Sequence, residues 1–209
     1  GRMLHDGGYS ADGTTCLERA GALAPRNGEY WYNLGLAGFR AGLLARAVEA
    51  LERSAELQPG NAAAWGALGL AQQQSGALDQ SEASLRKALD LNPRLLSAAH
   101  NLAVTLRKLD RAEDALAIID KAMQSGLSAP VTKTLRAHLL GELGRFDEAV
   151  QSYQALLAEP PGSIDAQETL ARLLPQLGRG DEAMSAYDDA LQRAPTKCDR
   201  GFRPLHPQH

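Results

Sequence analysis

The chain has 209 residues and a formal net charge of −3, and its 22% of charged residues carry both signs. Because neither sign dominates, the chain lacks the long-range attraction that nucleic acids need and the polybasic segment that binds anionic membranes. Hydrophobic residues make up 44% of the chain but aromatic residues only 5%, and this Ala- and Leu-rich balance favours helices over strands. We therefore expect an all-α fold with no nucleic-acid partner.

The cysteines and the chain ends bear on redox chemistry and location. Cys16 and Cys198 are the two cysteines, and their wide separation predicts neither a disulfide framework nor a zinc site. No run of about 18 apolar residues occurs, and the N-terminus lacks the apolar core of a secretory signal. We expect a cytoplasmic chain without membrane insertion. The opening Gly1-Arg2-Met3 is consistent with a cloning remnant or with the cut edge of a longer protein.

A period of 34 residues organises the sequence. Residues 31–35 read Trp-Tyr-Asn-Leu-Gly, residues 65–69 read Trp-Gly-Ala-Leu-Gly, and residues 100–103 continue the phase with His-Asn-Leu-Ala. Such self-similarity is the signature of a repeat architecture. Residues 1–27 fit the second half of a preceding repeat and are predicted to cap the N-terminal end. Five full units follow, at residues 28–61, 62–95, 96–129, 130–163 and 164–197.

Each unit is predicted to form two helices that pack closely. The eighth residue is always small, as Gly35, Gly69, Ala103, Ala137 and Ala171. The twentieth is small as well, as Ala47, Ser81, Ala115, Ala149 and Ala183. Small residues on facing helices let the two backbones approach. Between the helices stands Gly42, Gly76, Asp110, Gly144 or Gly178, which predicts a left-handed cap or a tight turn.

Prolines and the C-terminal tail set further boundaries. Pro59 and its equivalents Pro93, Pro161 and Pro195 are predicted to stop the second helices. Pro175 falls late in the first helix of the last unit, so that helix should kink or end near Leu174. Residues 198–209 show no helical period and are predicted to be a disordered tail.

The ordered series of Trp, Leu-Gly, Gly, Ala, aromatic or Leu, Ala and Pro resembles the tetratricopeptide repeat (TPR) family. The resemblance covers about 80% of the chain and implies a right-handed superhelical solenoid of antiparallel helix pairs. It also implies a concave groove, lined by the first helices, that holds a peptide or partner protein. Two units depart from the pattern, with Leu127 at the proline position of the third and Arg136 at a leucine position of the fourth.

No catalytic motif survives inspection. Residues 84–87 match a Ser-x-x-Lys pattern, but they lie within a predicted helix and lack the companion motifs of acyl-enzymes. The acidic pairs at 147–148 and 181–182 open second helices, where carboxylates favour the helix dipole. We therefore expect no enzyme activity and no cofactor. Phosphate-binding glycine loops and zinc-protease motifs are likewise missing from the sequence.

The positions of each repeat that are expected to face the groove predict which residues bind a peptide. The predicted set is Tyr32, Leu36, Phe39, Leu70, Gln73, His100, Arg107, His138 and Arg172. Tyr32, Leu36 and Phe39 form a second apolar stripe on the first helix, which is either an exposed ligand contact, the interpretation that we favour, or a cover for the N-terminal half-repeat. The basic residues of this set are candidates for binding a carboxylate. Alternatively, they form a solvent-exposed face without a ligand. Asn33 and Asn101 match a partial asparagine ladder, whereas the lysine-and-asparagine clamp of chaperone adaptors is not recognisable.

A metal site at His100 and His138 is the weaker interpretation of these two histidines, because surface histidines at helix spacing are usually solvated.

The leading interpretation is a non-catalytic scaffold that binds a peptide or partner protein. The alternative is the substrate-docking arm of a larger bacterial enzyme, such as a transferase or hydroxylase. The final helix, near residues 181–194, carries apolar residues such as Tyr187 and Leu191 without a visible capping helix. Because a repeat array needs such a cap, we expect a weak homodimer through this face.

Overall fold

The computed structural model describes residues 26–158, 164–179, 182 and 184. The chain divides into two compact units, unit 1 (Gly1–Leu127) and unit 2 (Ser128–His209). All regular structure in the described ranges is helical, and they contain no strand. The prediction of an all-α fold is confirmed. The proposed N-terminal half-repeat and the tail lie outside the described residues.

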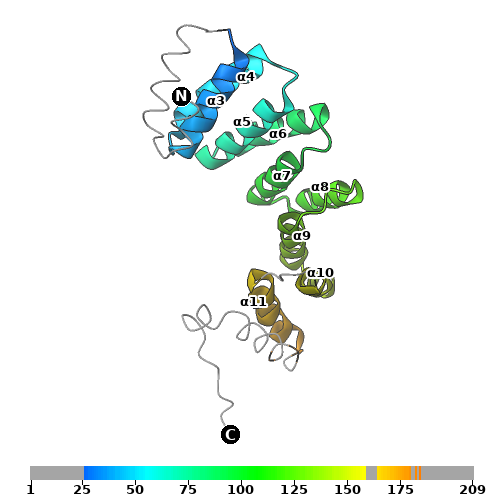
Figure 1. Cartoon of the computed structure of the whole chain (residues 1–209). Helices are drawn as coiled ribbons and strands as arrows, with labels where there is room; N and C mark the ends of the chain where they lie inside the picture. Colours follow the sequence, from blue (N-terminus) through cyan, green and yellow to red (C-terminus); the bar gives the residue numbers. More distant parts are fainter. Residues whose placement is uncertain (1–25, 159–163, 180–181, 183, 185–209) are drawn as a thin grey trace. The chain divides into compact units, whose positions relative to one another are not determined.

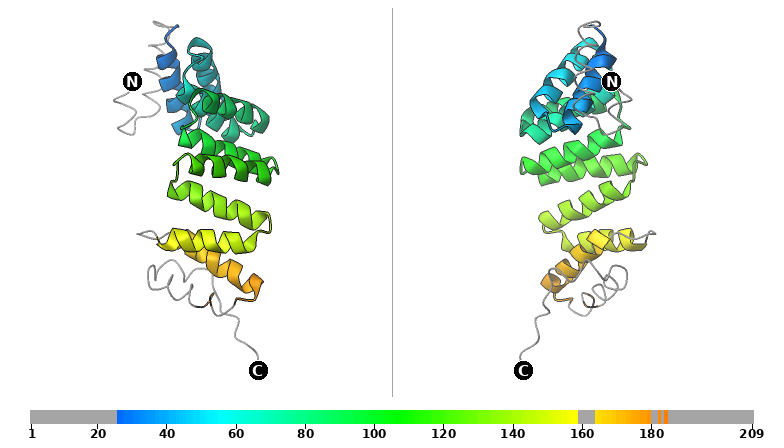
Figure 2. Two further views of the ribbon diagram at one scale, coloured as in Figure 1. Left: turned by 90° about the vertical axis from the view of Figure 1, so that its right-hand side faces the viewer. Right: turned by 60° about the vertical axis from the view of Figure 1, so that its left-hand side comes forward.

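Unit 1 consists of three antiparallel helical hairpins. Its helices are α3 (Gly28–Arg40), α4 (Leu44–Leu57), α5 (Ala62–Ser75), α6 (Leu78–Leu91), α7 (Leu96–Lys108) and α8 (Ala112–Gln124). Each odd-numbered helix packs on the next to form a hairpin, and the hairpins also contact one another through α4 with α5 and α6 with α7 (Figure 1). Figure 2 shows these blue-to-green helices as successive layers.

Unit 2 continues the same pattern over its described residues. It contains α9 (Pro130–Glu142), α10 (Phe146–Ala158), α11 (Ile164–Leu173) and the short 3-10 helix η1 (Leu174–Leu177). The α-helix gives way to 3-10 geometry just before Pro175, so the predicted end near Leu174 is confirmed. The proline lacks the N–H that a further α-helical turn would use. The predicted last helix, near residues 181–194, lies outside the described ranges apart from two residues.

Local sequence signals fix where the helices begin. The first helices of the hairpins start at residues 28, 62, 96, 130 and 164, a spacing of 34 residues. The side chain of Asn27 caps α3 by accepting hydrogen bonds from the backbone of Glu29 and Tyr30 at 3.0 and 3.2 Å. Asn61 caps α5 in the same way, and Pro130 occupies the first turn of α9. Asparagine at this position and proline just after it are both favoured at helix starts.

The turns inside the hairpins share one backbone conformation. Gly42, Gly76, Gly144 and Gly178 have φ between 71° and 87°, and Asp110 has φ of 58°. All five positions therefore adopt the left-handed conformation that the repeat pattern predicts. Asp110 is the single non-glycine with positive φ among the described residues, and aspartate tolerates this region better than most residues do.

Close backbone approach holds the first two hairpins together. A Cβ atom added to Gly35 would lie 2.5 Å from Cγ of Leu51, and one added to Gly69 would lie 2.5 Å from Cγ of Leu85. These two contacts are equivalent, one repeat apart. Leu51 and Leu85 are fully buried, as are Ala47 and Ser81 beside them. Small residues at both points thus let a leucine of the second helix lie directly on the backbone of the first.

Candidate peptide-binding surface

The first helices of unit 1 present one continuous face. Leu36 of α3, Leu70 of α5 and Val104 of α7 are the ninth residues of their repeats, and all three are partly exposed. The helix α5 contacts both α3 and α7 directly. We call this surface the first-helix face of unit 1; it consists of Leu36, Leu70 and Val104 together with the basic residues Arg40, Arg107 and Lys108. Its centre is an apolar strip that is neither fully buried nor fully exposed.

The basic residues of the first-helix face all lie at the C-terminal ends of their helices. Arg40 is in the last turn of α3, and Arg107 and Lys108 are in the last turn of α7. Cations are favoured at helix C-termini, which explains their position in the free protein. They also give the apolar strip a positive border, suited to an acidic side chain or a terminal carboxylate.

The structure gives Tyr32 and Phe39 a packing role, and their predicted contact with a ligand stays a prediction. Both rings are partly buried and pack against a cluster of Ala47, Leu51, Ala55, Leu68 and Ala71. They therefore fill the space where α3 meets α4 and α5. Only the exposed part of each ring is available to a ligand, and both side chains contribute to the packing of the first hairpin.

Gln73 lies inside the stack of hairpins. Its side chain is 4% exposed, and its amide donates to the backbone oxygen of Asn101 at 3.0 Å and to Thr105 Oγ1 at 2.7 Å. Its amide nitrogen therefore donates between α5 and α7. The structure thus gives this predicted groove residue an internal role, as a polar link between two repeats.

His100 is half-buried on α7, and burial lowers the pKa of its imidazole below the ordinary value of 6.5. Its Nδ1 atom is buried and has no hydrogen-bond partner within the described structure. A lowered pKa keeps the ring neutral at pH 7, so the positive charge of the first-helix face comes from its arginines and lysine.

His138 and Arg172 belong to unit 2. The ring of His138 on α9 meets the ring of Tyr153 on α10 edge to face, with centroids 5.7 Å apart. Arg172 is exposed in the last turn of α11. Within the described residues no group of three or more metal-ligating side chains comes together.

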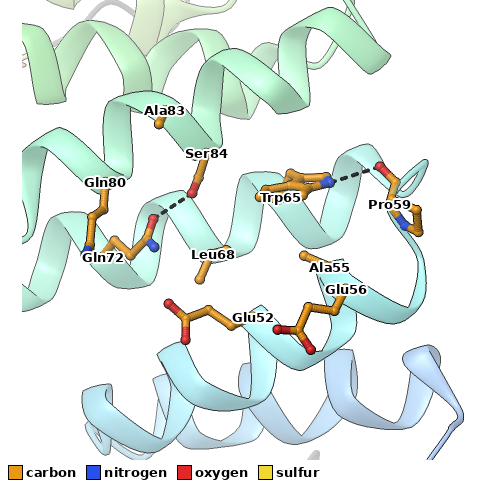
Figure 3. Close-up of a pocket in the computed structure, with 10 residues that line it drawn as sticks. All are labelled: Glu52, Ala55, Glu56, Pro59, Trp65, Leu68, Gln72, Gln80, Ala83 and Ser84. Carbon is orange, nitrogen blue, oxygen red and sulfur yellow. Dashed lines mark hydrogen bonds between the residues drawn. The ribbon is translucent and has the colours of Figure 1, made fainter.

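A hollow on the other side of unit 1 was not predicted from the sequence. It has a volume of about 520 Å³ and lies between α4 and α6, with α5 beneath it (Figure 3). Trp65, Leu68 and Gln72 line it from α5, and their spacing puts them on the face of that helix opposite Leu70. Glu52 and Glu56, one turn apart on α4, line one wall. The acidic pair and the nearby tryptophan were visible in the sequence, but their convergence requires three placed helices.

The fold relates the chain to known proteins. The family model described as "Tetratricopeptide repeat" matches residues 8–62, 45–95 and 134–197. No curated protein shows significant sequence similarity. Among solved structures, a tetratricopeptide repeat protein from Parabacteroides merdae aligns with a TM-score of 0.78 at 19% identity, covering 92% of this chain and 76% of that one.

Two further solved structures share the fold. MamA from Desulfovibrio magneticus, from residue 41 onward, aligns with a TM-score of 0.73 at 14% identity and covers 81% of this chain and 96% of its own. YrrB, described as a TPR protein with an unusual peptide-binding site, aligns with a TM-score of 0.69 at 19% identity, covering 87% of this chain and 94% of its own.

Stacked helical hairpins of this kind define the class of helical repeat proteins. Because the family matches span most of the sequence, the chain belongs to the tetratricopeptide repeat family. The predicted all-α solenoid of such repeats is confirmed. No helix in the described ranges is long and apolar enough to cross a membrane.

Proposed function

We propose that this chain is a non-catalytic interaction scaffold that binds a peptide segment of a partner protein on the first-helix face of unit 1. The observation that carries the proposal is the partly exposed apolar strip of Leu36, Leu70 and Val104, which the first helices of three successive hairpins present side by side. Repeat stacking makes extended surfaces of this type. YrrB, which shares the fold, is described as having a peptide-binding site.

The chemistry of the strip specifies the peptide. Apolar side chains at intervals along the peptide would cover the strip, and each one buried contributes favourably by removal of apolar area from water. At one end the peptide meets Arg40, Arg107 and Lys108, which favour an acidic residue or a C-terminal carboxylate. The expected ligand is therefore an extended or helical segment with spaced apolar residues and negative charge at one end.

A random peptide library displayed on phage tests this proposal. Selection on the purified chain should enrich sequences with spaced apolar residues and an acidic end, and their binding should weaken as salt rises because exposed charges are screened. The double substitution Leu36→Ser and Leu70→Ser should abolish the selection. Enrichment of basic peptides, or enrichment that survives this double substitution, would contradict the proposal.

The expectations of a cytoplasmic location and of a weak homodimer remain predictions that accompany this proposal. The docking-arm alternative makes the same surface bind a substrate protein, and an enzymatic domain following residue 209 in the gene would support it.

A further inference from the structure

The hollow between α4 and α6 combines three features that together suit a particular ligand. Its volume is about 520 Å³, enough for a side chain and the backbone next to it. Its lining includes two carboxylates, from Glu52 and Glu56, and no basic residue. It also includes the indole of Trp65 and the apolar side chains of Ala55, Leu68 and Ala83.

The tryptophan is held in place by its own hydrogen bond. Its Nε1 donates to the backbone oxygen of Pro59 at 3.0 Å, which fixes the orientation of the ring. The ring is partly exposed and packs on the core cluster. Figure 3 shows the indole on α5 and the side chains of Glu52 and Glu56 on α4 on either side of the hollow. An aromatic surface of fixed orientation is a good partner for a cation.

The two carboxylates are incompletely neutralised. Glu56 pairs with Arg53 at 2.7 Å, but these side chains are 64% and 51% exposed, and exposed pairs of this kind contribute little. Glu52 forms no ion pair with any residue that the structure describes. Two like charges one helical turn apart also destabilise the helix slightly. A cation that enters the hollow would relieve this repulsion.

The polar groups that α5 and α6 contribute to the hollow are uncharged. Gln72 is 4% exposed and accepts a 2.7 Å hydrogen bond from Ser84 through Oε1, so these two oxygen atoms are paired within the fold. The negative charge of the hollow is therefore concentrated on the α4 side. A ligand with an apolar stem and a cationic head matches a hollow that is acidic on the α4 side and apolar elsewhere.

We propose that this hollow is a second binding site that accepts an arginine side chain of a partner protein. The planar guanidinium stacks on an indole and binds carboxylates in a fork, whereas a lysine ammonium does only the second, and as a point charge. The methylene stem lies along Ala55, Leu68 and Ala83. Because Leu70 points to the opposite face of α5, this site is independent of the first-helix face.

The test uses three short capped peptides, acetyl-Gly-X-Gly-amide, in which X is arginine, lysine or citrulline. Citrulline has nearly the shape of arginine without the charge. The readout is the indole N–H resonance of Trp65 in nitrogen-15 NMR spectra, assigned by comparison with Trp31→Phe. The arginine peptide should shift this resonance with a Kd of about 1 mM, the lysine peptide should bind roughly threefold more weakly, and the citrulline peptide should not bind.

The double substitution Glu52→Gln and Glu56→Gln should weaken arginine binding about tenfold, because both charges are removed from the wall. Glu49→Gln is the matched control, since Glu49 is an exposed acid of the same helix outside the hollow, and it should change the Kd less than about twofold. Leu70→Ser should leave arginine binding intact.

Three results would overturn the proposal. One is a shift of the Trp65 resonance with the citrulline peptide that equals the shift with the arginine peptide. Another is undiminished binding of the arginine peptide by the double variant. The third is a Trp65 resonance that depends on protein concentration and no longer responds to peptide, which would make the occupant a second copy of this chain.

Discussion

Gln73 on α5 donates a 2.7 Å hydrogen bond to Thr105 Oγ1 on α7, and both side chains are buried. Thr105 also donates to the backbone oxygen of Asn101 and lies 3.1 Å from Ser81 Oγ. This network joins the second and third hairpins through polar groups that water does not reach. Buried polar groups of this kind are costly to leave without partners.

Thr105→Val should therefore lower the free energy of unfolding by about 1–2 kcal/mol, because it removes the acceptor of Gln73 while keeping the shape of the side chain. Urea denaturation measures the change. Thr134→Val is the matched control, since Thr134 is partly exposed and bonds only within its own helix, to Pro130 at 2.9 Å. If both variants are equally stable, the network does not contribute.

Two glycines of α5 should respond oppositely to the same substitution. Gly69→Ala places a Cβ 2.5 Å from Leu85 Cγ and should cost about 1–3 kcal/mol by overpacking. At Gly66 the nearest atom would be 3.4 Å away, so Gly66→Ala should raise stability by up to about 1 kcal/mol through helix propensity. Thermal unfolding of the two variants decides this, and a stabilised Gly69→Ala would contradict the close approach of the helices.

Phe39→Ala should destabilise the chain by about 2–3 kcal/mol, because the ring packs on the core cluster of the first hairpin. Leu36→Ala on the same helix should cost less, since Leu36 is not packed against that cluster. Chemical denaturation followed by circular dichroism compares the two. A loss below about 0.5 kcal/mol for Phe39→Ala would instead make the ring a surface contact.

Stability should fall at high pH because of Tyr153. This side chain is 1% exposed, and burial raises its pKa from 10.0 to about 12. Between these two values the unfolded chain loses the phenolic proton while the folded chain keeps it, so unfolding becomes easier as pH rises from 10 to 12. The effect is about 2 kcal/mol. Tyr153→Phe should show a smaller decline over this window, and an unchanged decline would exclude this cause.

The sequence predicted the parts of the fold that depend on local pattern. The small residues at Gly35 and Gly69, the left-handed turn at Asp110 and the helix end before Pro175 all follow from the 34-residue phase and backbone sterics. At Asp110 the position within the repeat predicted the turn, whereas the residue type did not, because an aspartate alone does not indicate a positive φ.

Which side chains are exposed on the candidate binding surface was harder to predict, because exposure depends on how neighbouring helices pack. Gln73 was assigned to the groove by its phase, yet it turns inward because α7 provides Thr105 and a carbonyl oxygen for it. Tyr32 and Phe39 occupy repeat positions expected to be exposed, but their rings also pack against the core cluster of alanines and leucines. The hollow beside Trp65 needs three helices to form, and no single helix signals it.

The most direct test of the peptide-binding proposal is the site at which a selected peptide binds. Backbone amide NMR of the chain, titrated with the tightest library peptide, should show its largest shifts at Leu36, Leu70 and Val104 and their neighbours on α3, α5 and α7. Leu70→Ser should raise the Kd at least about tenfold without changing the fold, because an anchoring apolar contact is lost. Shifts confined to α4 and α6, or an unchanged Kd for Leu70→Ser, would contradict binding on the first-helix face.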